Sequence, residues 1–354
     1  MAGRAVGVDP GTMFFQVAER EPDGTISTKS TRNAFVELEA SADVEDILNS
    51  NKWQFIKDGN NFYVIGEDAM KVANILPGKV ELRRPLQDGV LNSGEEKKIL
   101  ILQQLAKGGL GEPSKDGKNI VCFCVSSLSA DGSVDSASHK ARLMGLFKSL
   151  GWTPYVIDEA YAVVLSENPK IIEDGIEIPL SGIGLSCGAG RTNIVLSYKG
   201  LQLIGASCAR GGDWIDKKVH ESTDKPLSVI TRAKETRLDF GNIDFDDDII
   251  FALDVYYGEM IKFVFSKFSH AFKQLEKESI QSPIPVIIAG GTSMPKGFCK
   301  KVEEVVKELD LPFEISEIRH AAEPRDAVVK GCMTQAIRVK KKLDKDDDLS
   351  SVAG

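Results

Sequence analysis

The chain has 354 residues, a length that suggests about two domains. Its hydrophobic fraction of 42% and charged fraction of 27% are ordinary for globular proteins, so each domain can bury a core without disulfides or metals. The net charge of −8 argues against bulk nucleic-acid binding, which needs a basic surface. No apolar run reaches the ~18 residues of a membrane span, and the first ten residues lack a signal-peptide core, so we expect a cytoplasmic protein.

The six cysteines give no sign of a metal site. Only Cys122 and Cys124 lie close together, inside an apolar run, whereas metal sites prefer a wider spacing and a second ligand pair. None of the four histidines neighbours a cysteine. The pattern favours reduced thiols in the core of an intracellular protein.

An internal repeat organises the chain. Residues 6–11 (VGVDPG) and 183–188 (IGLSCG) match each other half a chain length apart. In each copy an apolar run enters a glycine turn, a second apolar run leaves it, and a third short run follows another turn. Strand, turn, strand, turn, strand is a meander pattern, and two copies predict a duplicated α/β domain.

Helices and strands alternate after each meander. Apolar residues three and four apart predict helices, and short apolar runs predict buried strands. The expected helices of the first half are 95–107, 138–150 and 159–167, and its further strands are 120–125 and 155–157. In the second half we expect helices over 254–277, 295–309 and 326–339, with a strand over 285–289.

These elements predict two domains with polar inserts. The first domain spans 1–158, with an insert at about 32–76, and is completed by a C-terminal helix over 325–343. The second domain spans 159–324, with an insert at about 213–251. Each insert is expected to form a small subdomain beside a cleft. Residues 344–354, rich in aspartate, are expected to form a flexible acidic tail.

Glycine turns follow three of the expected strands. Asp9 precedes Gly11 and Thr12 in the first turn, and the equivalent turn of the repeat spans 188–192. A third turn spans 290–293. Glycines let backbone N–H groups approach an anion, and a carboxylate can hold hydrated Mg²⁺. Each turn alone is more often an ordinary turn, but the three together favour a phosphate clamp. Neither a P-loop nor a Rossmann fingerprint is present.

Several segments make the resemblance to a family specific. Residues 7–12 (GVDPGT) and 188–192 resemble two phosphate motifs, 157–160 (IDEA) a connecting motif, and 289–292 (AGGT) an adenosine motif. Residues 211–213 (GGD) and 84–90 (RPLQDGV) match further segments. Together they resemble the superfamily of actin, heat-shock ATPases and sugar kinases, and within it the bacterial actin-like branch that includes MreB and MamK. The resemblance covers about residues 5–337.

The resemblance implies a fold and a site. The expected fold is actin-like, with two RNase-H-like α/β domains around a cleft that holds ATP and Mg²⁺. Asp9 would organise the metal through water, and Glu159 would orient or deprotonate the attacking water. From the residues alone, Glu159 is equally well explained as a first-turn carboxylate favoured by the helix dipole. The implied nucleotide-binding residues are Asp9, Gly11, Thr12, Gly188, Gly190, Thr192, Gly212, Lys234, Glu235, Gly290, Gly291 and Thr292.

Two positions depart from the family pattern. Ser186 stands where relatives have an aspartate that helps to organise Mg²⁺, which predicts slow ATP hydrolysis. Arg191 stands where relatives often have a small or hydroxyl residue, and it could reach a phosphate or face solvent.

The function expected from the resemblance is a polymerising cytoskeletal protein that is a slow ATPase. It would associate with itself into filaments and could also bind a cargo or adaptor protein, and no nucleic acid is expected. Two alternatives stay open. One is a non-polymerising nucleotide-binding adaptor of an assembly or secretion apparatus, and the other is a small-molecule kinase of the same fold.

Overall fold

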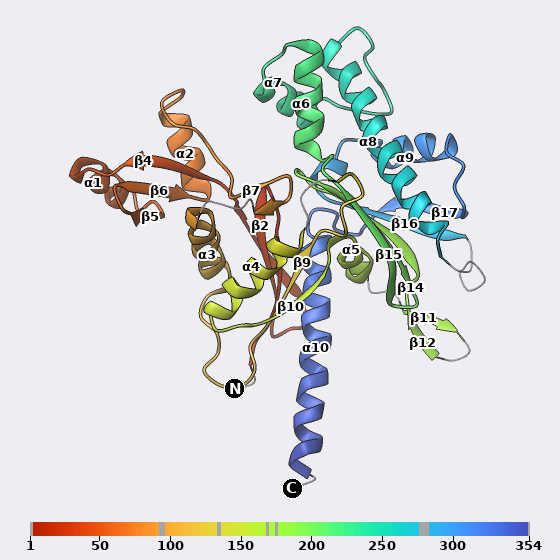
Figure 1. The fold of residues 1–354 in the computed structure, drawn as a ribbon, viewed down its shortest axis with the longest axis horizontal. Helices are drawn as coiled ribbons and strands as arrows, with labels where there is room; N and C mark the ends of the chain where they lie inside the picture. The colour runs from red at the N-terminus through yellow and green to blue at the C-terminus, as the bar shows by residue number, and fades with distance from the viewer. Residues whose placement is uncertain are drawn as a thin grey trace.

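A computed structural model describes residues 3–91, 96–132, 136–167, 170–173, 176–275 and 283–352. Two five-stranded sheets form the body of the molecule, and a long C-terminal helix runs between them (Figure 1). Within these ranges, no helix is long and apolar enough to cross a membrane.

The two sheets repeat one topology. The first has the strand order β10-β9-β1-β2-β3 and the second β15-β14-β13-β16-β17. In each, a meander of antiparallel strands is extended by two parallel strands on the side of its first member. The duplicated domain predicted from the repeat is therefore confirmed. The strands are β1 (Ala5–Pro10), β2 (Phe14–Arg20), β3 (Ile26–Arg32), β9 (Ile120–Val125) and β10 (Thr153–Asp158), then β13 (Gly182–Cys187), β14 (Thr192–Tyr198), β15 (Leu201–Cys208), β16 (Ile284–Ala289) and β17 (Ile315–His320).

Two helices pack between the sheets, α5 (Glu159–Glu167) and α10 (Ala327–Val352). The repeat glycines explain how closely they approach. A Cβ at Gly7 would lie 2.3 Å from the backbone nitrogen of Met333 on α10, and a Cβ at Gly184 would lie 2.0 Å from the carbonyl of Ala160 on α5. Only a bare backbone fits at both positions. These two repeat glycines therefore serve helix packing.

Further helices cover the outer faces of the sheets. Helices α3 (Glu96–Leu110) and α4 (Ser136–Ser149) pack on the first sheet, and α8 (Asp248–Phe272) and α9 (Phe298–Lys307) pack on the second. Asp247 caps α8 by accepting from the backbone N–H groups of Ile249 and Ile250. The core of the second domain is aromatic, with Tyr257, Phe268 and Phe298 fully buried.

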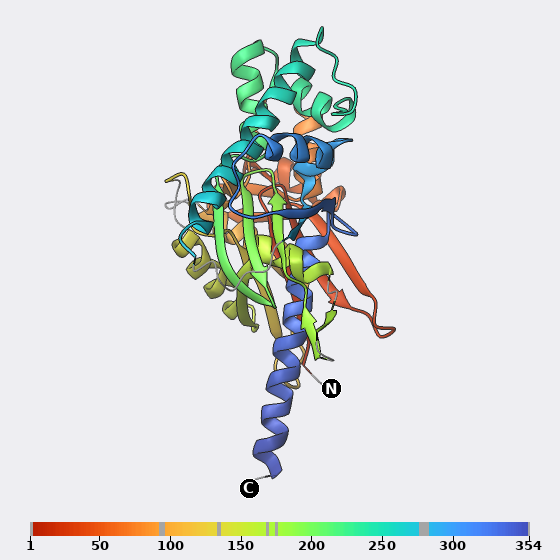
Figure 2. The same cartoon turned by 90° about the vertical axis from the view of Figure 1, so that its right-hand side faces the viewer.

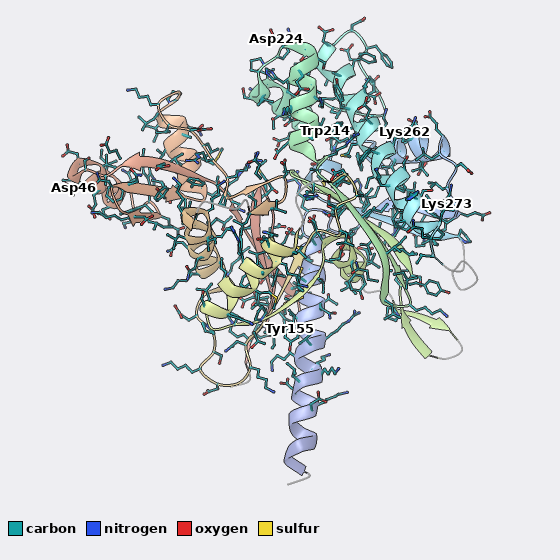
Figure 3. The ribbon with its side chains drawn as sticks, viewed as in Figure 1. Asp46, Tyr155, Trp214, Asp224, Lys262 and Lys273 are labelled. Carbon is teal, nitrogen blue, oxygen red and sulfur yellow. The ribbon has the colours of Figure 1, made fainter. Side chains whose placement is uncertain are left out.

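The first insert is a small lobe. Strands β4 (Phe35–Glu39), β5 (Phe55–Asp58) and β6 (Asn61–Ile65) form a sheet beside α1 (Ala42–Ser50) and α2 (Glu67–Ile75), with its own buried apolar cluster. Figure 3 labels Asp46 at the outer end of this lobe.

The second insert contributes α6 (Gly212–Thr223) and α7 (Leu227–Thr236), which pack on α8. Figure 3 labels Asp224 at the outer end of α6. The described chain also has two short hairpins: β7 (Leu86–Gln87) with β8 (Val90–Leu91), and β11 (Lys170–Glu173) with β12 (Ile176–Pro179).

Two of the predicted helices begin at residues other than those expected. The helix expected over 254–277 begins at Asp248 because Asp247 caps it there, and it ends at Phe272, while residues 276–282 lie outside the described ranges. The helix expected over 295–309 begins at Phe298, because Gly297 has a left-handed backbone that stops the helix (φ 79°).

The expected tail 344–354 is helical as far as Val352, and residues 353–354 lie outside the described ranges. An ion pair between Lys340 and Asp344 at 2.9 Å, one turn apart, supports this continuation of α10. The helix projects beyond the body in both views (Figures 1 and 2).

Candidate functional site

The two repeated glycine loops meet face to face. The first loop is residues 11–13, between β1 and β2, and the second loop is residues 188–191, between β13 and β14. A Cβ at Gly190 would lie 2.6 Å from Thr12 Oγ1 and 2.5 Å from the backbone nitrogen of Gly89. The second loop therefore contacts the first domain so closely that only glycine fits at Gly190. The structure thus brings Gly11, Thr12, Gly188 and Gly190 together at the junction of the domains.

Two acidic side chains lie beside these loops. Asp9 is near the end of β1, where a Cβ at Gly11 would be 3.5 Å from its Oδ1. Glu159 begins α5, and its Oε1 would lie 3.9 Å from a Cβ at Gly188. The same Oε1 accepts a hydrogen bond from Ser186 Oγ at 2.7 Å. Ser186, the departure from the family pattern, is therefore the partner of the predicted catalytic carboxyl.

Both carboxyls bind protons more tightly than usual. Burial raises the pKa of Glu159, the negative charge of Asp9 raises it further, and the Ser186 hydrogen bond lowers it in part. Burial also raises the pKa of Asp9, against a smaller lowering by Cys124, whose Sγ lies 3.4 Å from Asp9 Oδ1. A cation bound between two carboxyls with raised pKa values would stabilise their ionised forms.

The carboxyls of this site fit an Mg²⁺ ion that takes most of its coordination shell from phosphate oxygens and water. Within the described ranges, no group of three or more His, Cys, Asp or Glu side chains could hold a metal ion. Mg²⁺ commonly uses one or two carboxylates and completes its shell with phosphate oxygens and water. Asp9 and the glycine loop beside it match that division.

Asp158, next to Glu159, has a structural role. One of its carboxylate oxygens accepts from the backbone N–H of Ala160 at 2.8 Å, at the start of α5, and the other accepts from Ser127 Oγ. Burial raises its pKa to about 6, although these hydrogen bonds lower it in part. Asp158 therefore fixes the first turn of α5, and with it the place of Glu159.

The third glycine turn closes on the second loop. Thr292 Oγ1 donates to the Gly188 carbonyl at 2.8 Å, and the Gly212 backbone N–H donates to the same carbonyl at 3.0 Å. A Cβ at Gly290 would lie 2.3 Å from the Cys187 carbonyl, so this turn also needs a bare backbone. Gly291, by contrast, is exposed, and a Cβ there would meet no atom within 4 Å.

Lys234 reaches this junction and is held there. Its Nζ lies 2.7 Å from Asp216 Oδ1 and donates to the Gly212 carbonyl at 3.0 Å. Thr231 Oγ1 donates to the other Asp216 oxygen at 2.7 Å. This buried ion pair ties α7 to the start of α6. Glu235, the next residue, is exposed.

The Thr192 hydroxyl is bound within the second domain. This hydroxyl donates to the Arg210 carbonyl at 2.7 Å, and the residue is fully buried. The first side chain of β14 thus points into the second domain, where it anchors the loop.

Sequence reasoning missed the roles of three residues at this junction. Arg84 Nη1 lies 2.6 Å from Asp213 Oδ2 and so joins segment 84–90 to α6. Cys124 contacts Asp9 from the neighbouring parallel strand. The parallel pairing of Val8 with Phe123 predicts that neighbourhood once the strands are placed in register.

Arg191 is the third of these residues, and its side chain neither faces solvent nor lies free to reach a phosphate. It is buried, with Nε donating to Ser207 Oγ at 2.9 Å and Nη1 donating to the Asp88 carbonyl at 3.1 Å.

Solved structures share this fold at low sequence identity. A MamK double helical filament has a TM-score of 0.68 and 18% identity over 94% of this chain and 98% of the other. MreB5 of Spiroplasma citri bound to ADP has a TM-score of 0.65 and 14% identity over 96% and 98%. A non-polymerising MamK mutant bound to AMPPNP has a TM-score of 0.59 and 17% identity over 95% and 99%. These likenesses confirm the actin-like fold.

Comparison by sequence gives a family. No curated protein matches the chain. The sequence profile of the volactin family matches residues 4–336, nearly the whole length. The chain therefore belongs to the volactin family and has the actin-like fold.

Proposed function

We propose that this protein binds Mg-ATP between its two domains and assembles into filaments. The observation that carries the proposal is the junction of the two glycine loops, where Gly190 meets Thr12 beside the carboxyls of Asp9 and Glu159. The likeness to a MamK filament and to nucleotide-bound structures of MamK and MreB5 supports the same reading.

The residues divide into two groups around the nucleotide. Backbone N–H groups of the first and second loops would cradle the phosphates, with the Thr12 hydroxyl as a further donor. Asp9 would hold Mg²⁺, which supplies positive charge against the phosphates. On the nucleoside side, the exposed backbone at Gly291 offers free space next to Gly290. The buried Lys234 would act by holding Gly212 in place, and exposed Glu235 would be available to the ribose or base.

Glu159 is suited to act as a general base in hydrolysis. A base works best when its pKa is near the working pH, and burial together with Asp9 moves that of Glu159 upward. The hydrogen bond from Ser186 fixes the orientation of the carboxyl. We therefore infer a slow ATPase in which Glu159 accepts a proton from the attacking water.

Exposed apolar side chains favour self-association over a monomeric adaptor. Phe245 and Phe251 are 73% and 46% exposed, and their ring centroids lie 6.0 Å apart on the second insert. Ile47 and Ile75 are also exposed, on the first insert. Soluble monomers seldom expose apolar groups in patches, and such patches mark interaction sites.

The nucleotide site can be tested by two glycine substitutions. Gly291→Ala should fold as well as wild type, because the new methyl group meets no protein atom. If the nucleoside lies against Gly291, the same methyl group should weaken Mg-ATP binding about tenfold, measured by calorimetry. Gly108→Ala is the matched control, since its Cβ also meets no atom and it lies on α3.

Thermal unfolding gives the complementary measurement. A ligand that binds only the folded protein stabilises it by about 2.7 kcal/mol at a hundredfold excess over Kd. The wild type and Gly108→Ala should both show this shift with Mg-ATP. A wild-type melting temperature that millimolar Mg-ATP leaves unchanged would refute the proposed site.

A further inference from the structure

Arg191 joins the second loop to two segments of the first domain. The first segment is the hairpin, residues 86–91, whose turn contains Asp88 and Gly89. The second is the strap, residues 127–131, which follows β9. Arg191 is 3% exposed, so its guanidinium lies inside this contact.

The hairpin lies directly on the arginine stem. A Cβ at Gly89 would be 2.6 Å from both Cγ and Cδ of Arg191, so the turn packs against the side chain with a bare backbone. Gly89 also has a left-handed backbone (φ 75°). Arg191 Nη1 also donates a hydrogen bond to the Asp88 carbonyl of the same turn at 3.1 Å.

The strap is reached through Ser207. The Ser207 hydroxyl accepts from Arg191 Nε at 2.9 Å, and the Ser207 backbone pairs with the strap. Its N–H donates to the Leu128 carbonyl at 3.0 Å, and its carbonyl accepts from the Ala130 N–H at 2.8 Å. One buried side chain therefore contacts the hairpin directly and the strap through Ser207.

A neutral histidine completes the hairpin contact. His139, on α4, accepts from the Leu91 backbone N–H at 3.2 Å through Nδ1. Burial and the positive charges of Arg191 and Arg142 lower its pKa to about 4, so the imidazole is uncharged at neutral pH and can accept. The hairpin is thus fixed to α4 at one end and to Arg191 at its turn.

A second side-chain link lies just before the hairpin and is weaker. The Arg84–Asp213 pair, at 2.6 Å, has side chains 32% and 41% exposed. Exposed pairs contribute about 0–1 kcal/mol, whereas hydrogen bonds from a buried charged group contribute more. Arg191 is the stronger of the two links.

We propose that Arg191 is a positioning residue that keeps the two glycine loops face to face by fastening the second loop to the hairpin and the strap. Its side chain is buried between the hairpin and Ser207, and it acts on bound phosphate through the position of Gly190. The expected effect of Arg191 on Mg-ATP binding rests on the proposed function. The contact that Arg191 makes between the domains can be tested without a ligand.

Hydrogen–deuterium exchange of the ligand-free protein tests this contact. Arg191→Met keeps the aliphatic part of the side chain but removes every hydrogen-bond donor. Arg191→Lys keeps the positive charge but lacks the separate guanidinium nitrogens that reach two acceptors. In the Met variant we expect about tenfold faster exchange in the hairpin and the strap, with unchanged protection in β9 and β16. The Lys variant should be intermediate. Arg237→Gln is the control, because Arg237 pairs with Asp247 inside the second domain.

Two results would overturn the inference. Unchanged exchange in the hairpin and strap of Arg191→Met would show that the contact does not depend on Arg191. Equal loss of protection in both domain cores would show a general structural role instead.

Calorimetry with Mg-ATP then separates this inference from the proposed function. Arg191→Met should bind about tenfold more weakly than wild type, and Arg237→Gln should bind equally well. A wild type that binds no Mg-ATP refutes the proposed function, while the exchange experiment still decides the role of Arg191. Equal affinity of wild type and Arg191→Met would overturn the inference alone.

Discussion

Replacing Ser186 by aspartate would place a third carboxyl beside Asp9 and Glu159. Ser186 is 1% exposed, and its Oγ donates to Glu159 Oε1 at 2.7 Å. The substitution therefore replaces a hydrogen-bond donor by a negative charge at a site where burial already raises the pKa of both neighbours.

The expected penalty is large compared with the stability of a domain. Two unit charges ~4 Å apart interact by about 4 kcal/mol at an effective dielectric constant of ~20, which equals about 3 pKa units. Losing the serine donor adds about 1–3 kcal/mol. A whole domain is stable by only about 5–15 kcal/mol.

The pH dependence has a definite sign. A carboxyl whose pKa is raised in the folded state binds its proton more tightly there than in the unfolded chain. Ser186→Asp should therefore be much less stable than wild type at pH 8 without ligand, and should recover as the pH falls toward 5. Mg-ATP, which brings a cation, should also restore it.

Urea unfolding at pH 5 and pH 8, with and without Mg-ATP, measures these effects. Ser186→Ala separates the lost hydrogen bond from the added charge. Ser228→Asp adds the same charge at an exposed position of α7 and should behave as wild type. If Ser186→Asp is as stable as Ser228→Asp at pH 8 without ligand, the electrostatic reasoning about this site is refuted.

Three further predictions concern the same carboxyls. Glu159→Gln keeps an acceptor for Ser186 and should bind Mg-ATP nearly as wild type, but phosphate release should slow about 100-fold; equal rates would make Glu159 a structural residue. Because the pKa values of Asp9 and Glu159 are raised, Mg-ATP affinity should fall from pH 8.5 to pH 6, and calorimetry in two buffers should detect proton release on binding; a pH-independent affinity contradicts this. Cys124→Val removes the thiol that lowers the pKa of Asp9, so this variant should bind Mg-ATP more weakly at pH 7 than Cys122→Val, a buried control on the same strand. Equal affinities of the two variants would show that the thiol has no such effect.

Much of the fold follows from local patterns. The repeat of glycine turns predicts two meanders, and apolar spacing predicts most of the helices that cover them. The exact helix ends depend on single residues such as Gly297 and Asp247, whose backbone state the spacing does not specify. The continuation of α10 past residue 343 escaped prediction because its charged sequence has no apolar periodicity there.

The glycine loops of the site could be predicted from the sequence, but the side-chain contacts that hold these loops in place could not. Gly11, Gly188 and Gly190 sit in turns that their sequence motifs identify. The roles of Arg191 and Thr192 depend on which way a side chain leaves a strand end and on how closely the two domains approach. Such long-range contacts leave no periodic signal in the sequence.

Nucleotide-dependent assembly is the central claim, and sedimentation of the purified protein tests it most directly. With Mg-ATP, the protein should pellet above a critical concentration, and electron microscopy of the pellet should show filaments, as expected from contacts that repeat head to tail without closing. Without nucleotide, or with Gly291→Ala at ATP concentrations below its weakened Kd, it should stay in the supernatant. A protein that binds Mg-ATP but remains monodisperse over a wide concentration range would contradict the claim and support a nucleotide-binding adaptor instead.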